Sequence, residues 1–417
     1  MINFLDERIV KLSKIADLDL APVFEKLDNV CEINSHKVMG AFIKNRVSSG
    51  DFCDINGYGY YDGGRDKLEK IFAEVLGGED ALVRPHIMSG TNAIALVLTA
   101  LLHHGDTMLS ISGLPYDSLR GIIGLTGNST QSLMYNGVKY EQIDLVNNDF
   151  DYDKIEERIK KGGVTVVAIQ RSRGYSDRKS LTIAQHEKVI KKIKDIDKNV
   201  IIMVDNCYGE LVETKEPTEV GADVIVGSLM KNLGGGIASS GGYVVGKTEL
   251  IEQIAERLTA PGIGKSLGAN FNQNLQFFKG LYMAPSAVRN ALKTAVFTAY
   301  MLKNLGFDGI DPAFDEERTD IIQTVALKNQ DNLVKFCQGM QKGSPVDSFA
   351  TVEPGEMPGY PHDEVMAAGT FTQGSTIELS CDAPVTEPYT AYMQGGLTYE
   401  YGKYGVMVAL SEMVKGK

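Results

Sequence analysis

One lysine stands alone in a glycine-rich loop directly after an apolar run of the sequence. Residues 224–226 are apolar and β-branched, which is typical of a buried strand, and Gly227 and Ser228 follow them. Lys231 comes three residues later, and the glycines at 234–236 leave the backbone there uncovered. An amine at the carboxyl end of a core strand lies where an α/β protein places its chemistry. We interpret Lys231 as an amine that forms a Schiff base with an aldehyde, and the alternative is a solvated loop lysine.

A second candidate site precedes an apolar helix. Ser89, Gly90 and Thr91 stand shortly before residues 94–102, which are apolar enough to form a buried helix. The first N–H groups of a helix have no partner within it, and the helix dipole is positive at that end. These three residues therefore form a candidate phosphate site, although Ser89 or Thr91 acting as a plain N-cap explains the same pattern.

Two further side chains follow predicted strands. Tyr116 lies in a tight loop after the strand predicted at residues 107–111, and Asp205 directly follows the buried strand predicted at residues 200–204. Open α/β sheets bind their ligands at the carboxyl ends of the strands. We expect Asp205 to be buried and to require a cationic partner.

Together these features match the needs of pyridoxal 5′-phosphate. Its phosphate requires backbone donors, which Gly90 and Thr91 offer, and its ring requires an aromatic face, which Tyr116 offers. Its pyridine nitrogen requires a carboxylate such as that of Asp205, so that the ring acts as an electron sink. Its aldehyde requires an amine that can lose a proton near neutral pH, and Lys231 is the candidate.

An arginine cluster and a tyrosine-rich loop are candidates for ligand binding. Arg171, Arg173 and Arg178 follow a predicted strand, where arginines can bind a carboxylate with two parallel hydrogen bonds. The alternative is a solvated basic loop. Tyr58 and Tyr60 alternate with glycines in another loop, and they either reach a ligand or simply order that loop.

The order of predicted elements defines the fold class. Strands and helices alternate from about residue 80 to residue 258, which predicts an α/β fold with a mostly parallel sheet. Residues 5–48 predict two helices with a break between residues 17 and 22, and residues 273–305 predict a long helical segment broken near Pro285. The predicted domains are an N-terminal helical arm at 1–50, a large cofactor-binding α/β domain at 51–275 and a smaller α+β domain at 276–417.

The composition argues against several other functions. The formal net charge of -12 disfavours nucleic acid or an anionic membrane as a partner. No apolar run reaches the ~18 residues needed to span a bilayer, and the first residues do not resemble a secretory signal. Five widely spaced cysteines indicate free thiols in a reducing cytoplasm. The six histidines form no metal-binding pattern, and we expect no metal.

The motifs taken together resemble a known family. They lie at residues 57–69, 89–93, 113–117, 204–206, 228–236 and 395–399. They resemble the methionine γ-lyase or aluminium-resistance family, which belongs to the fold-type I pyridoxal phosphate enzymes and is related to the cystathionine lyases. The resemblance extends over roughly residues 5–415. It implies a mostly parallel seven-stranded sheet flanked by helices, with a smaller α+β domain at the C-terminal end.

The resemblance also implies roles for individual residues. Lys231 is the Schiff-base lysine, Asp205 the partner of the pyridinium nitrogen, and Tyr116 the residue that stacks on the ring. The full set of implied cofactor-binding residues is Gly90, Thr91, Tyr116, Asp205, Asn206, Ser228, Lys231, Tyr58 and Tyr60.

The same resemblance implies an oligomeric assembly, and it shows that some arginines of the relatives have no counterpart in this chain. In related lyases a tyrosine and an arginine of the neighbouring subunit touch the phosphate, and here Tyr58 and Tyr60 occupy that region without the arginine. We therefore expect a homodimer or homotetramer with sites at the subunit interface. The substrate-carboxylate arginine of the relatives has no match in the C-terminal region. We expect Arg171 or Arg173 to take that role, and the alternatives are Arg178 or a different substrate.

The expected activity is carbon–sulfur bond cleavage in a sulfur-containing amino acid, as in a methionine γ-lyase or cystathionine β-lyase. Lys231 removes the α-proton, Asp205 keeps the ring protonated, and Tyr116 donates a proton to the leaving sulfur. The alternatives are an aminotransferase or an aldolase-type enzyme on the same scaffold, or a non-catalytic protein that binds pyridoxal phosphate. The substrate is in each case a small amino acid, and the expected location is the cytoplasm.

Overall fold

The computed structural model describes residues 4–58, 62–356 and 362–415. The chain forms two compact units, of which the larger is Ser35–Tyr282 and the smaller combines Met1–Asn34 with Met283–Lys417. The boundaries between the units fall within two long helices, α2 (Ala21–Lys44) and α9 (Asn274–Asn304). The sequence-based division at residues 50 and 275 stays a prediction.

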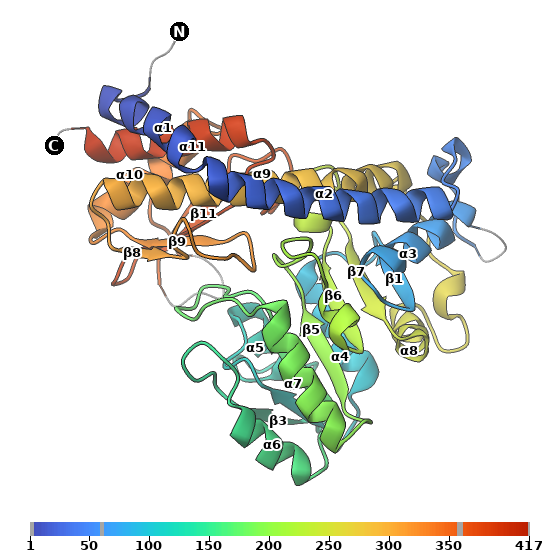
Figure 1. The fold of residues 1–417 in the computed structure, drawn as a ribbon. Coiled ribbons are helices and arrows are strands. Elements are labelled where there is room, and N and C mark those ends of the chain that lie inside the picture. Colours follow the sequence, from blue (N-terminus) through green and yellow to red (C-terminus); the bar gives the residue numbers. More distant parts are fainter. Residues whose placement is uncertain (1–3, 59–61, 357–361, 416–417) are drawn as a thin grey trace. The chain divides into compact units, whose positions relative to one another are not determined.

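The larger unit is built on a seven-stranded sheet in the described part of the chain, with the strand order β1-β7-β6-β5-β4-β2-β3 (Figure 1). Neighbours from β3 to β6 are parallel, whereas β7 runs antiparallel to both β6 and β1. The predicted mostly parallel sheet is therefore confirmed. The strands are β1 (Asp80–Arg84), β2 (Thr107–Ser110), β3 (Lys139–Gln142), β4 (Val166–Gln170), β5 (Ile201–Asp205), β6 (Val224–Ser228) and β7 (Gly242–Gly246).

Helices cover both faces of this sheet because its strands are apolar on both sides. Val224 and Val226 pack in one cluster with α4 and α8, and the residue between them points to the opposite face. Tyr243 lies on that opposite face, against Phe72 of α3 at 6.1 Å between ring centroids. The helices of this unit are α3 (Gly63–Val75), α4 (Gly90–Leu101), α5 (Asp117–Ile123), α6 (Tyr152–Lys160), α7 (Ile183–Ile196) and α8 (Thr248–Leu258), and short 3-10 turns are η1 (Ser49–Phe52), η2 (Pro217–Val220), η3 (Asn232–Gly234) and η4 (Gly264–Ser266).

The smaller unit has a separate core. Its described residues form a five-stranded antiparallel sheet in the order β10-β11-β12-β9-β8. One apolar cluster joins this sheet to residues of α1, α9, α10 and α11, as expected for a smaller α+β domain. The elements are α1 (Glu7–Asp19), β8 (Gly309–Asp311), β9 (Gln323–Ala326), α10 (Gln330–Lys342), β10 (Glu364–Ala367), β11 (Ser380–Pro384), β12 (Thr390–Gln394) and α11 (Tyr399–Val414).

One predicted break is confirmed and another is wrong. The N-terminal segment divides into α1 and α2 at Leu20, within the predicted interval. The predicted break near Pro285 does not occur, because α9 continues through this proline. Proline removes one backbone donor from a helix, but Ala284, Ala287 and Val288 beside it are buried, and their burial keeps this stretch helical.

Two global expectations can be compared with the structure directly. Within the described residues, none of the helices is both long and apolar enough to cross a membrane. All five cysteines are free thiols, and four of them are buried.

Candidate active site

The amino end of α4 forms a polar cradle at the carboxyl edge of the sheet. Ser89 is the N-cap, and its hydroxyl accepts a hydrogen bond from Asn92 N at 3.1 Å. The N–H groups of Gly90 and Thr91 have no acceptor in the described part of the chain, as expected at a helix start. A side chain at Gly90 would meet Cys207 Sγ at 3.1 Å and Ser228 Cβ at 3.5 Å. Glycine therefore lets this helix end approach two neighbouring strand ends.

Ser228 ends β6 beside this cradle. Its side chain is buried, and its Oγ accepts a hydrogen bond from Met230 N at 3.1 Å. Because that bond uses an oxygen lone pair, the hydroxyl proton stays available to a ligand. Two N–H groups and one O–H group thus converge here, and the helix dipole adds positive potential.

Asp205 is the last residue of β5, the neighbour of β6 in the sheet. Its carboxyl group is buried, and its Oδ1 accepts a hydrogen bond from Cys207 N at 3.1 Å. Burial raises the pKa of Asp205, and the nearby Lys231 opposes part of that rise. A cationic ligand atom in front of this carboxyl group would therefore be favoured.

Tyr116 precedes α5 and reaches the same cradle. Its hydroxyl lies 3.0 Å from Thr91 Oγ1, and its backbone N–H donates to Gln170 Oε1 at 3.2 Å. Burial, with a contribution from the Asp205 carboxylate, raises the pKa of Tyr116, so its hydroxyl keeps its proton at neutral pH. The two hydrogen bonds join the loop after β2 to the end of β4 and to the start of α4.

Lys231 follows β6 and lies above the ring of Tyr208, with its Nζ 3.7 Å from the ring centroid. Burial lowers the pKa of Lys231, but Tyr208, Cys207 and Asp205 together outweigh this effect and raise the pKa above its usual value. The amine of the cofactor-free chain is therefore an ammonium ion. Its attachment to an aldehyde requires the loss of that proton.

Sequence reasoning missed Tyr208. The residue has a positive φ of 71°, and Leu211 in the same loop has a φ of 60°. Non-glycine residues rarely adopt this conformation, and such strain concentrates at functional sites. The sequence does place an aromatic residue only three positions after Asp205. Periodicity, however, does not show that the ring of this residue lies under Lys231.

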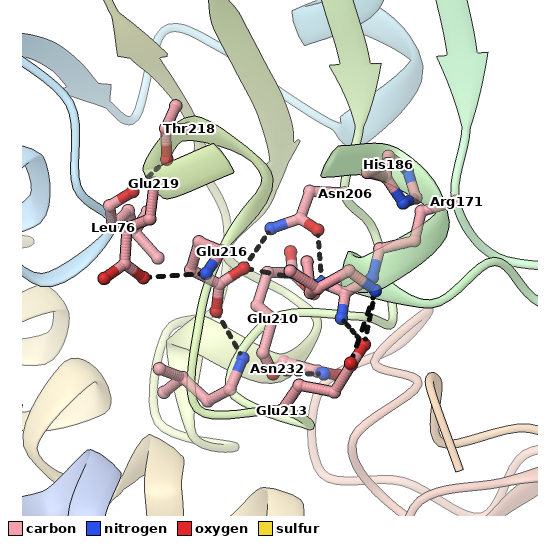
Figure 2. Close-up of polar contacts among 12 residues, drawn as sticks. Leu76, Arg171, His186, Asn206, Glu210, Glu213, Glu216, Thr218, Glu219 and Asn232 are labelled. Carbon is pink, nitrogen blue, oxygen red and sulfur yellow. Dashed lines mark hydrogen bonds and ion pairs between the residues drawn. The ribbon is translucent and has the colours of Figure 1, made fainter. Parts of the chain in front are cut away.

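The three arginines of the predicted cluster lie in different environments. Arg171 is fully buried and contacts Asn206, Glu213 and Glu216 (Figure 2). Arg178 donates to backbone carbonyl groups, among them that of Gln170 at 2.8 Å. Their guanidinium groups are thus bound to protein atoms rather than solvated.

The remaining predicted residues lie in three different settings. Arg173 is 3% exposed in the same loop as Arg171. The side chain of Asn206 is buried between Arg171 and Glu216 instead of facing the cradle. Tyr58 is 71% exposed and its backbone bridges to Leu267. Tyr60 lies outside the described residues.

The geometry fits pyridoxal 5′-phosphate. Unpartnered N–H groups at Gly90 and Thr91 suit a phosphate, and the glycine leaves room for it. The buried carboxyl group of Asp205 suits a protonated pyridine nitrogen, and Lys231 supplies an amine in the same cluster. No group of three or more metal-ligating side chains lies together in the described parts of the chain.

Comparison with known proteins assigns the chain to an enzyme family. The chain matches the methionine gamma-lyase family over residues 9–414. It is 43% identical to the uncharacterized protein YnbB of Bacillus subtilis over 98% of this chain and 97% of that protein.

Solved structures give the same result. A carbon-sulfur lyase involved in aluminum resistance from Clostridium novyi is 44% identical, with a TM-score of 0.94 over 99% of this chain and 97% of that one. A methionine gamma lyase from Micromonospora echinospora, at 16% identity, shares the fold with a TM-score of 0.57 over 84% of this chain and 87% of that one. The family and the Clostridium novyi relative define the class as carbon–sulfur lyases. The chain belongs to the methionine gamma-lyase family.

Proposed function

We propose that the protein cleaves a carbon–sulfur bond of a sulfur-containing amino acid, with pyridoxal 5′-phosphate attached to Lys231. The observation that carries the proposal is the convergence of Lys231, Asp205, Tyr116 and the start of α4 at one sheet edge, in a chain of this family. The comparisons favour this activity over the aminotransferase, aldolase and non-catalytic alternatives.

The same residues would hold the cofactor. Gly90, Thr91 and Ser228 would bind the phosphate, Tyr116 would stack on the ring, and Asp205 would face the ring nitrogen. When bound, pyridoxal phosphate supplies an electron sink that stabilises negative charge on the carbon next to the substrate amine.

The chain itself would move the protons. The Lys231 amine is the candidate base for the α-proton, because it is the amine of the cluster and is released when the substrate amine takes its place. The Tyr116 hydroxyl is the candidate acid for the departing sulfur, since its raised pKa keeps it protonated and Thr91 orients it. Asp205 would hold the ring nitrogen in its protonated form.

We propose Arg173 as the residue that binds the substrate carboxylate. It lies next to Gly174, where a side chain would come within 3.8 Å of Tyr116 Cβ, so its loop borders the site. Arg173→Lys should raise the KM for the substrate by about tenfold or more, because lysine lacks the two parallel donors of arginine. An unchanged KM would contradict this role.

We also propose that copies of the chain assemble through the surface beside α4. Tyr58, Met88 and Phe271 are 71%, 65% and 61% exposed. The loops of Tyr58 and Phe271 adjoin through the contact of Gly57 with Gly268, and His86 in the loop of Met88 packs on Phe271 at 5.1 Å between ring centroids. A cluster of large exposed apolar side chains is typical of an interface. Size-exclusion chromatography with light scattering should show a dimer or tetramer, and Phe271→Asp should shift it toward the monomer. The free cysteines support a cytoplasmic location.

Product analysis tests the activity. With L-methionine and water, γ-elimination gives methanethiol, 2-oxobutanoate and ammonia in equal amounts. With cystathionine and water, β-elimination gives homocysteine, pyruvate and ammonia. A keto acid without ammonia would identify an aminotransferase, and the absence of turnover on every sulfur amino acid would contradict the proposal.

A further inference from the structure

Arg171 belongs to a largely buried polar network with Asn206, Glu213 and Glu216 (Figure 2). Its Nη1 donates to Asn206 Oδ1 at 2.8 Å and lies 3.4 Å from Glu216 Oε2, while its Nη2 donates to Glu213 Oε2 at 2.8 Å. The side chain is 0% exposed, as is that of Asn206, and Glu216 is 1% exposed. One buried guanidinium group therefore faces the buried carboxylate of Glu216, the partly exposed carboxylate of Glu213 and a buried amide.

The same two carboxylates fasten the loop that follows β5. Glu216 accepts hydrogen bonds from Leu211 N and from the side-chain amide of Asn206, each at 2.8 Å. Glu213 accepts a hydrogen bond at 3.1 Å from Ile183 N, the first residue of α7. Arg171 thus holds residues 206–216 at their beginning and near their end.

The middle of this loop lies directly against the guanidinium group. A side-chain carbon at Gly209 would lie 2.6 Å from Arg171 Cδ and 2.7 Å from its Nε. This contact covers the Nε face, and no described residue accepts a hydrogen bond from Nε. A substrate carboxylate that approached Arg171 would therefore meet protein backbone at one edge of the guanidinium group. At the other edge it would meet the carboxylates of Glu213 and Glu216.

The loop adjoins one part of the site and carries another. It begins directly after Asp205, and its Tyr208 lies under the Lys231 amine, which is 3.7 Å from the ring centroid. The strained φ angles of Tyr208 and Leu211 persist only if the surroundings fix them. Asn232, the residue after Lys231, adds a second fastening, since its Nδ2 donates to the carbonyls of Tyr208 and Glu210 at 3.1 and 2.9 Å.

Buried ion pairs contribute more to geometry than to stability. Removing one partner is costly because it leaves a buried charge alone, whereas replacing both partners can be nearly neutral. An arginine surrounded in this way is better suited to holding a loop in one conformation than to binding a ligand that must exchange.

We infer that Arg171 is a positioning residue: with Glu213 and Glu216 it holds the loop that places Tyr208 under the cofactor-attaching amine of Lys231, and it does not bind the substrate carboxylate. The inference rests on the proposed function for the role of Lys231. It replaces the substrate-binding role expected for Arg171 with one exerted through Asn206 and the loop backbone.

Titration of the cofactor-free protein with pyridoxal 5′-phosphate, followed by cofactor absorbance, tests the inference without turnover. Arg171→Met should weaken cofactor affinity at least about tenfold, and Arg171→Met combined with Glu216→Gln should recover part of the loss. Arg158→Met, which breaks the remote Arg158–Glu141 pair, is the control and should leave the affinity unchanged. At saturating cofactor, Arg171→Met should lower kcat and leave the KM for methionine within about threefold.

Two results would overturn the inference. A KM raised tenfold with normal cofactor affinity would make Arg171 a substrate-binding residue. A lower melting temperature with unchanged cofactor affinity, kcat and KM would make it merely structural. If Arg171→Met does not fold, Gly209→Ala gives the same test, because its methyl group presses on Arg171. If the wild type binds no cofactor, the proposed function is wrong. If the wild type binds the cofactor but shows no turnover, the titration still tests whether Arg171 positions the loop.

Discussion

Asp205 shows how one residue links the fold to the chemistry. It closes an apolar strand, its carboxyl group is buried, and a backbone N–H is its hydrogen-bond partner. Burial raises its pKa, so the carboxylate form is costly in the cofactor-free chain and is stabilised by a cationic ring nitrogen. The carboxyl group and the cofactor should therefore stabilise each other.

Asp205→Asn should retain a cofactor on Lys231 but react slowly. The amide cannot hold the ring nitrogen protonated, so kcat should fall by about 100-fold or more, the scale of one preorganised charge. Steady-state kinetics at saturating cofactor measures the change. A variant with normal kcat would show that Asp205 does not face the ring nitrogen.

Among the helices and strands, the start of α4 is where a single added methyl group should affect cofactor binding most. Gly90→Ala places a methyl group 3.1 Å from Cys207 Sγ, closer than an ordinary van der Waals contact, within the proposed phosphate cradle. We expect cofactor affinity to fall about tenfold with little loss of stability. Gly40→Ala in helix α2 is the matched control, since nothing lies within 4 Å of its added carbon. Equal cofactor affinities for the two variants would contradict the cradle.

The elements also show what the sequence can predict. Strands β2, β5 and β6 lie within two residues of the predicted ends because they are apolar runs between polar loops. Lys231, Asp205, Tyr116 and Gly90 were found by their places at strand and helix ends.

Other parts of the site depend on contacts that no local pattern reveals. Sequence reasoning grouped Arg171 with Arg173 because they are neighbours in the chain. The acids that surround Arg171 come from residues 213 and 216, more than 40 positions later. Tyr208 was missed for a related reason, since its position depends on a strained backbone held by that network. The continuity of α9 through Pro285 depends on burial on both sides of the proline.

At the scale of the whole molecule, buried acids make stability depend on pH. Glu210 is fully buried, its Oε1 accepts a hydrogen bond from Tyr243 Oη at 2.8 Å, and burial raises its pKa to about 8. A carboxyl group whose pKa is higher in the folded chain stabilises the fold below its ordinary pKa near 4.5. That contribution is lost progressively as the pH rises from there to about 8.

Glu210→Gln should therefore lose less stability than the wild type between pH 5 and pH 8, because glutamine never ionises. Melting temperatures of the cofactor-free chains across this range measure the difference. Glu157→Gln is the control at an exposed position and should follow the wild type. Parallel curves for Glu210→Gln and the wild type would show that Glu210 does not titrate in this window.

The central claim is that Lys231 carries pyridoxal 5′-phosphate. Incubation with the cofactor, reduction with borohydride and mass spectrometry of the resulting peptides test it most directly, since reduction makes the bond between amine and aldehyde permanent. We expect one reduced cofactor per wild-type chain, on Lys231, and no comparable labelling of the Lys231→Arg variant. Labelling spread over surface lysines, with Lys231 unmodified, would contradict it.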